Sequence, residues 1–180
     1  MAVELLERAR NAYLERFSWV NGHADTWSVL RDGHTLALVV EALAALVEEA
    51  HPTVILGIEA RGFLLGPAVA RASGLGFVAV RKGAGLFPGP TDEAVSAPDY
   101  RGIRQRLRLR ADDLAAHDVV ALVDDWIETG SQASAARLLT QRAGARWAGC
   151  VVVVDQAEDG VREAVGPIRA VVPSSFLPEN

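Results

Sequence analysis

The sequence of 180 residues has little cysteine and few aromatic residues. Its single cysteine, Cys150, excludes an internal disulfide framework and favours a reducing compartment. Cys150 lies in the apolar run GCVVVV, so we interpret it as a core residue rather than a nucleophile. Half of the residues are hydrophobic but only 6% are aromatic, which predicts an aliphatic α/β core. The length suits one domain, and we expect residues 1–180 to form it.

The sequence also lacks excess positive charge and long apolar runs. The formal net charge of -5 argues against nucleic acid as the main partner. No apolar run approaches the roughly 20 residues that span a bilayer. The first residues, MAVELLERARNAYLERF, are charged throughout, which is not typical of a secretory signal. We therefore expect a cytoplasmic protein without a membrane partner, for which nucleic acid is an improbable ligand.

Common catalytic signatures are missing too. The four histidines are scattered without the spacing of metal ligands. There is no Walker-type Gly-Lys-Ser stretch and no Ser-His-Asp arrangement. These absences argue against zinc, nucleotide-triphosphate and serine-hydrolase chemistry.

Hydrophobic periodicity predicts an α/β fold with a twisted, mostly parallel sheet flanked by helices. Short apolar runs alternate with helical patterns, so strands should be joined by right-handed crossovers. The segment 83–98 is rich in glycine and proline and reads as a long surface loop that could act as a lid. The residues 18–27 break the first helical pattern and are also expected to form a loop. We expect helices within 6–17, 36–47, 64–74 and 134–143, and strands at 53–57, 76–80, 107–110, 119–123, 149–154 and 168–173.

The stretch VVALVDDWIETGSQASA, residues 119–135, joins a predicted strand to a predicted helix. In parallel sheets, ligands bind where strand ends meet helix N-termini. Backbone N–H groups in the turn formed by Thr129, Gly130 and Ser131 would favour an anion. Asp124 and Asp125 suit the vicinal hydroxyls of a ribose, or a magnesium ion. The alternative is an ordinary strand, turn and helix with an aspartate cap.

Two segments carry a resemblance to a known family. The hydrophobic run, Asp-Asp and Thr-Gly-Ser of 119–131 resemble the phosphoribosyl pyrophosphate (PRPP) motif of type I phosphoribosyltransferases. The stretch 55–91, which contains GIEARGF and VRK, is similar to adenine phosphoribosyltransferases over its whole length. This resemblance implies transfer of the phosphoribosyl group from PRPP to a nitrogen of a nucleobase, with a purine favoured and pyrophosphate released. It also implies Mg²⁺ as cofactor, a homodimer, and PRPP with a nucleobase or its nucleotide product as partners.

The resemblance further implies a role for each matching residue. Asp124 and Asp125 would hold the ribose hydroxyls and contribute to a metal site. The 5′-phosphate would lie in the turn formed by Glu128, Thr129, Gly130, Ser131 and Gln132. The pyrophosphate would be held by Glu59, Ala60, Arg61, Arg81 and Lys82. A small hood at about 17–30 would cover the base, and the flexible loop at about 83–98 would close over the site.

Two stretches depart from the adenine enzymes. Those enzymes carry Leu-Glu-Tyr-Gly after the flexible loop, with a catalytic glutamate, whereas Asp99 and Tyr100 are the nearest match here. Their hood contains Phe-Arg-Asp over the adenine, where this sequence has His23, Ala24 and Asp25. We therefore take Ala24 and Asp25 as base contacts, together with two residues that follow the aspartates, Trp126 and Ile127. An indole at this place could stack near a base.

Glu128 is the second candidate for the catalytic carboxylate. Hypoxanthine-guanine phosphoribosyltransferases have an acid at this position of the PRPP loop, facing the purine ring. We hypothesise that Glu128 replaces the missing glutamate and, when protonated, donates to a ring nitrogen. The alternatives are that Asp99 is the acid, or that Glu128 only faces solvent. Two other functions stay open: a non-catalytic PRPP-binding sensor, and a phosphoribosyltransferase for a pyrimidine or unusual base in secondary metabolism.

Overall fold

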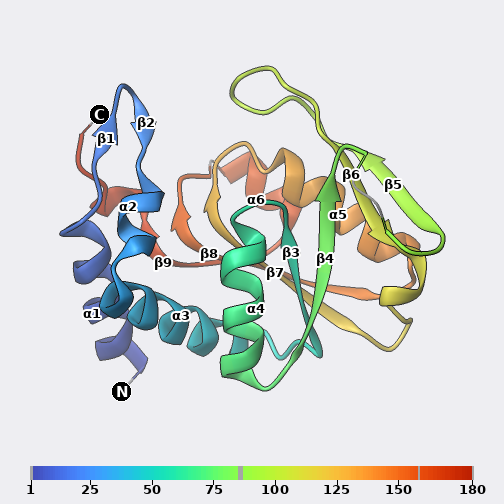
Figure 1. The fold of residues 1–180 in the computed structure, drawn as a ribbon, viewed down its shortest axis with the longest axis horizontal. Coiled ribbons are helices and arrows are strands. Elements are labelled where there is room, and N and C mark those ends of the chain that lie inside the picture. The colour runs from blue at the N-terminus through green and yellow to red at the C-terminus, as the bar shows by residue number, and fades with distance from the viewer. Residues whose placement is uncertain (1, 85–86, 158, 180) are drawn as a thin grey trace.

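A mixed seven-stranded sheet forms the centre of the computed structural model, which describes residues 2–84, 87–157 and 159–179 (Figure 1). The order across the sheet is β5-β6-β4-β3-β7-β8-β9. Five neighbouring strands, from β4 to β9, run parallel, and β6 and β5 continue the sheet antiparallel at one edge. This confirms the predicted α/β fold. The strands are β3 (Val54–Ile58), β4 (Gly76–Lys82), β5 (Thr91–Val95), β6 (Arg106–Arg110), β7 (Val119–Ile127), β8 (Arg146–Asp155) and β9 (Ile168–Pro173).

Helices cover both faces of the sheet, which explains the continuous hydrophobic strands. One face packs against α1 (Ala2–Leu14), α3 (Gly33–Glu48) and α4 (Gly62–Ser73). The other face packs against α5 (Ser131–Arg142) and α6 (Asp159–Val165). Successive residues of β8 alternate between the two cores: Val151 belongs to the first, and Cys150 and Val152 belong to the second. Short 3-10 turns occupy Ala111–Asp113 and Ser174–Phe176. Within the described ranges, no helix has the length and apolar character needed to cross a membrane.

The predicted loop at 18–27 is instead a hairpin followed by a helix. Strands β1 (Trp19–Val20) and β2 (His23–Ala24) pair antiparallel, and α2 (Thr26–Arg31) follows directly. Asn21 and Gly22 at the tip both have positive φ, the backbone that an Asn-Gly hairpin turn requires. The hairpin and α2 form the N-terminal hood, which rises beside the C-terminus (Figure 1).

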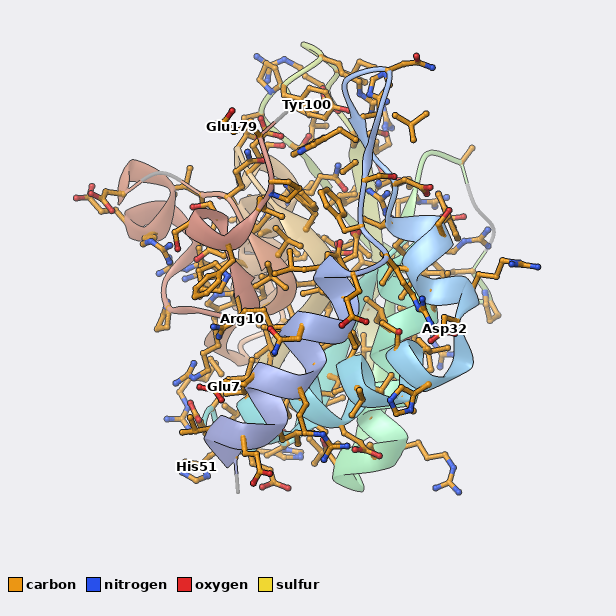
Figure 2. All side chains as sticks on the ribbon, turned by 90° about the vertical axis from the view of Figure 1, so that its left-hand side faces the viewer. Glu7, Arg10, Asp32, His51, Tyr100 and Glu179 are labelled. Carbon is orange, nitrogen blue, oxygen red and sulfur yellow. The ribbon has the colours of Figure 1, made fainter. Side chains whose placement is uncertain are left out.

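The C-terminal segment holds the hood in place. The Trp19 indole N–H donates to the Pro178 carbonyl over 3.0 Å. Nearby, the Arg10 guanidinium lies over the Phe176 ring at 4.2 Å, and its Nε donates to the Val171 carbonyl. Figure 2 shows Arg10 on α1, beside this segment. The hood is therefore tied to a part of the chain far away in the sequence.

The prediction of an uninterrupted loop at 83–98 is wrong for its second half, and residues 85–86 lie outside the described ranges. Strand β5 occupies 91–95 and pairs with β6, with Ala94 opposite Leu107. Ala94 is buried against the second core, so tertiary packing rather than local pattern makes this segment a strand. The loop that joins β5 to β6 covers 96–105, and it projects beyond the sheet on the same side as the hood (Figure 1).

Candidate active site

A cavity of about 520 Å³ opens where β3, β7 and β8 end, between the hood and the 96–105 loop. Most residues that the sequence singled out line it, and Asp25 and Arg81 are the exceptions. The cavity therefore brings together segments separated by over a hundred residues in the chain. The singled-out residues in its wall are Ala24, Glu59, Ala60, Arg61, Lys82, Asp99, Asp124, Asp125, Trp126, Ile127, Glu128, Thr129, Gly130, Ser131 and Gln132.

The two aspartates lie within β7, because this strand continues to Ile127 rather than ending at Val123. Asp125 is only 4% exposed, and its Oδ2 lies 2.8 Å from Nε of Arg61. Asp124 accepts the Asp125 N–H through Oδ1 at 2.9 Å. Burial, followed by the neighbouring Asp125 charge, raises the pKa of Asp124 well above its ordinary value. A buried carboxylate of this kind gains from a hydroxyl donor or a cation.

Arg61 connects this acidic pair to the hood. Its Nη1 donates to Oγ1 of Thr26, the buried first residue of α2, over 3.1 Å. The same guanidinium pairs with Asp125, so β7, the loop after β3 and α2 meet at one side chain. A cation held from two sides is well placed to meet an anionic ligand in the cavity.

Glu59 and Lys82 line the cavity at the ends of β3 and β4. Glu59 Oε2 accepts the Lys82 backbone N–H at 3.0 Å and lies 3.6 Å from Nε of Arg81. Arg81 therefore pairs beside the cavity rather than lining it. Burial is the main cause that lowers the pKa of Lys82. Within the described ranges, the Lys82 ammonium forms no ion pair, so it is available to a ligand.

The turn at 129–132 has the geometry of an anion site. Gly130 has φ of +63° and leads into α5, which begins at Ser131. The Thr129 hydroxyl lies 3.2 Å from that of Ser131, and both residues line the cavity. Backbone N–H groups at the start of a 12-residue helix attract negative charge. The turn can thus hold a phosphate in the same cavity as the acidic pair and Arg61.

Helix α6, which the sequence did not predict, packs directly behind this turn. A Cβ at Gly130 would lie 2.4 Å from Cγ1 of Val161 and 3.0 Å from Cγ1 of Val165. The helix is fixed by an ion pair between Arg162 and the buried Asp155 at the end of β8. Glycine at position 130 is therefore required both by the backbone and by close packing.

We expect Gly130→Ala to lower the free energy of unfolding by about 1–3 kcal/mol, because the new methyl group meets Val161 at a left-handed backbone position. Denaturant unfolding followed by circular dichroism measures this. The matched control is Gly160→Ala in α6, where a Cβ would meet nothing within 4 Å. Equal losses in the two variants would contradict the packing explanation.

Aromatic rings form the wall next to the hood. Trp126 stacks on Phe17 with centroids 6.0 Å apart and meets Trp19 edge-on at 5.9 Å. Trp19 and Trp126 both line the cavity, as do Ala24 and the largely buried Ile127. A planar base would therefore find apolar surface here. Sequence reasoning missed Trp19, although its position just before an Asn-Gly turn marked the start of the hood.

Asp25 does not have the position expected for a base contact. Its carboxylate caps α2, where Oδ1 accepts the Ser28 N–H at 3.1 Å and Oδ2 accepts the Ser28 hydroxyl. Asp25 is absent from the lining of the cavity. The segment Asp-Thr-Trp-Ser is a helix start, and that local role uses the side chain.

The two candidate acids differ in their surroundings. Asp99 accepts the backbone N–H groups of Arg101 and Ile103 at 2.9 and 3.0 Å, and pairs with the Arg101 guanidinium at 2.9 Å. The Ile103 N–H, with Arg101 beside it, lowers the pKa of Asp99. Glu128 is exposed on the cavity wall, and in the described part of the chain its carboxylate has no hydrogen-bond or ion-pair partner. Of the two, only Glu128 has a carboxylate that is free to contact a ligand.

Among the described residues of the cavity wall, Asp124 and Asp125 are adjacent carboxylates that could contribute to a metal site. No group of three or more His, Cys, Asp or Glu side chains that could enclose a metal ion occurs in residues 2–84, 87–157 and 159–179. Asp125 is already paired with Arg61, which leaves the Asp124 oxygens. This donor set fits Mg²⁺ shared with a phosphorylated ligand, since Mg²⁺ is usually bound by one or two carboxylates plus substrate oxygens.

Comparisons with known proteins agree with this arrangement. The phosphoribosyl transferase domain family matches residues 26–170. An adenine phosphoribosyltransferase of Streptomyces coelicolor is 38% identical over 85% of this chain and 82% of its own length. The crystal structure of adenine phosphoribosyltransferase from Rhodothermus marinus superposes with a TM-score of 0.79 at 29% identity, covering 93% of this chain and 99% of that one. The enzyme from Saccharomyces cerevisiae, complexed with an imino-altritol bisphosphate and adenine, gives 0.80 at 27% identity, covering 92% and 99%. The chain therefore belongs to the phosphoribosyl transferase domain family.

Proposed function

We propose that this protein transfers the phosphoribosyl group from PRPP to a ring nitrogen of a purine base and releases pyrophosphate. The observation that carries the proposal is one cavity whose wall contains the acidic pair Asp124 and Asp125, an anion-binding turn and the cations Arg61 and Lys82. PRPP has a matching set of groups: a 5′-phosphate, two ribose hydroxyls and a pyrophosphate. The names of the relatives as adenine phosphoribosyltransferases support a purine as acceptor.

The proposed binding mode follows from the position of each group. The turn at 129–132 holds the 5′-phosphate, and Asp124 and Asp125 accept the ribose hydroxyls. Glu59, Ala60 and Arg61 form the loop that, with Lys82, holds the pyrophosphate. The bond between C1′ and the pyrophosphate oxygen breaks, and its electron pair leaves with pyrophosphate. The lone pair of the base nitrogen then forms the new bond to C1′, so catalysis rests on positioning and charge stabilisation.

Glu128 is proposed as the group that handles the proton of the base. Its carboxylate takes the ring N–H proton as the new bond forms, and it returns that proton to the leaving base in the reverse direction. Its free carboxylate on the cavity wall supports this role. Asp99 is held by Arg101 and two backbone N–H groups, which argues against it as the acid.

Three further expectations belong to the same proposal. Mg²⁺, which Asp124 would hold, supplies neutralising charge to the pyrophosphate when bound. A homodimer is expected from the resemblance to type I phosphoribosyltransferases, and the exposed side chains of Trp27, at 56%, and Leu64, at 51%, are candidates for its interface. A cytoplasmic location is supported by the buried free thiol of Cys150.

The direct test is pyrophosphate release from PRPP and Mg²⁺ across a panel of purine, pyrimidine and imidazole-type bases. We expect release with one purine and none without a base. Release only with a pyrimidine would replace the proposed acceptor while keeping the reaction. PRPP binding without release from any base would instead support the PRPP sensor, for which the occupied Asp99 is the favouring observation.

A further inference from the structure

The 96–105 loop carries a cation into the cavity wall. Arg101, with Asp99 and Tyr100, lines the cavity, and its side chain is 52% exposed. The guanidinium pairs with Asp99 at 2.9 Å and lies 5.5 Å from the centroid of the Tyr100 ring. Both partners belong to the same turn, so the pairing holds Arg101 to no other part of the fold. It can turn away from Asp99 without disturbing the sheet.

Arg101 also contributes positive charge to the part of the cavity where the pyrophosphate is proposed to bind. After burial, the charges that act on Lys82 are those of Asp124 and Asp125, which raise its pKa, and of Arg61 and Arg101, which lower it. Arg61 and Arg101 therefore both lie near Lys82, and all three side chains line the same cavity. Arg61 is offset by Asp125, and Lys82 has no partner of its own in the described ranges. Such a gathering favours a ligand with several negative charges.

We propose that Arg101 binds the pyrophosphate group of the substrate, exchanging its pairing with Asp99 for the ligand's phosphate oxygens. This rests on the proposed function and adds a residue to it. The guanidinium can form two parallel hydrogen bonds to a phosphate, each to a separate oxygen, whereas its Nε and Nη2 share the single Oδ2 of Asp99 at 3.2 and 2.9 Å. The stretch in which the adenine enzymes carry a catalytic glutamate thus presents a positive charge to the leaving group.

Isothermal titration with Mg²⁺ and inorganic pyrophosphate tests this without knowledge of the base. Arg101→Ala should weaken pyrophosphate binding roughly 10- to 100-fold. Arg101→Lys should recover only part of the loss, because an ammonium cannot form the paired contact. Arg104→Ala is the matched control, since Arg104 is exposed in the same loop but does not line the cavity. It should bind pyrophosphate like the unmodified protein.

Asp99→Asn separates ligand binding from a purely structural role. An asparagine can still accept the Arg101 and Ile103 N–H groups, but it holds the guanidinium less strongly. The variant should therefore bind pyrophosphate about two- to fivefold more tightly. If Arg101 only shaped the turn, Asp99→Asn and Arg101→Ala would both weaken binding, and this result would overturn the inference. Unchanged affinity in Arg101→Ala would overturn it while leaving the proposed function intact, whereas failure of the unmodified protein to bind PRPP or pyrophosphate would overturn both.

Discussion

Glu128→Gln is expected to lower kcat by roughly 10²–10⁴-fold while leaving the affinity for PRPP nearly unchanged. Glutamine keeps the size of the side chain but cannot take or return a proton. Because Glu128 has no partner within the described ranges, the change should not disturb the fold. Steady-state kinetics with the base found by the panel gives kcat, and titration with PRPP in the presence of Mg²⁺ gives the affinity.

A control variant and a separate measurement of base binding accompany this prediction. Glu163→Gln, an exposed change on α6 away from the cavity, should leave both quantities unaltered. Trp19 and Trp126 lie in the cavity wall, so quenching of their fluorescence can report base binding separately from turnover. If Glu128→Gln turns over normally and Asp99→Asn does not, the roles proposed for the two acids must be reversed.

Asp124→Asn should stabilise the fold and at the same time lower the turnover of the enzyme. The buried Asp124 carboxylate lies next to Asp125, and removing its charge relieves that repulsion and the loss of hydration. We expect a gain of about 1 kcal/mol in the free energy of unfolding at neutral pH. Turnover should fall at least roughly 100-fold, because the ribose hydroxyls lose a charged acceptor and Mg²⁺ loses an anionic ligand. Thermal unfolding and pyrophosphate release measure the two effects.

The stabilisation should depend on pH in one direction. The pKa of Asp124 is raised in the folded protein, so above its ordinary value the folded state binds more protons than the unfolded state. Stability of the unmodified protein therefore falls as pH rises from the ordinary pKa through the raised one. The variant lacks this loss, so its advantage in Tm should be smallest near the ordinary carboxyl pKa of about 4 and should grow as pH rises above it.

Asp125→Asn is the opposite control. It removes the negative charge of the Asp125 carboxylate, whose Oδ2 lies 2.8 Å from Nε of Arg61 and whose side chain is almost fully buried. Allowing for the partial exposure of Arg61, we expect a loss of about 1–2 kcal/mol. If both asparagine variants were destabilised equally, the assignment of repulsion to Asp124 and attraction to Asp125 would fail.

The features predictable from sequence are those that local pattern determines. Continuous apolar runs marked the buried parallel strands, and the Asp-Asp and Thr-Gly-Ser stretch marked the site because its chemistry is contained in eight consecutive residues. In the structure, these residues line one cavity together with Arg61 and Lys82.

What the sequence could not predict depends on contacts between distant segments. Strand β5 has a weak pattern of its own and acquires its structure by pairing with β6. Helix α6 is only seven residues long and is held by Arg162 on Asp155. The roles of Asp25 and Asp99 could not be predicted for another reason. Both carboxylates accept hydrogen bonds from nearby backbone N–H groups, Asp25 as a helix cap and Asp99 within a turn.

The hydrogen bond from the Trp19 indole to the Pro178 carbonyl has a consequence for biosynthesis. The hood and α1 leave the ribosome early, but α1 packs against β9 and the hood is tied to the segment that follows β9. The aromatic side of the cavity thus stays incomplete while the sheet is being translated. The hood gains this hydrogen bond only after Pro178 has been translated, which is later than every residue that lines the cavity.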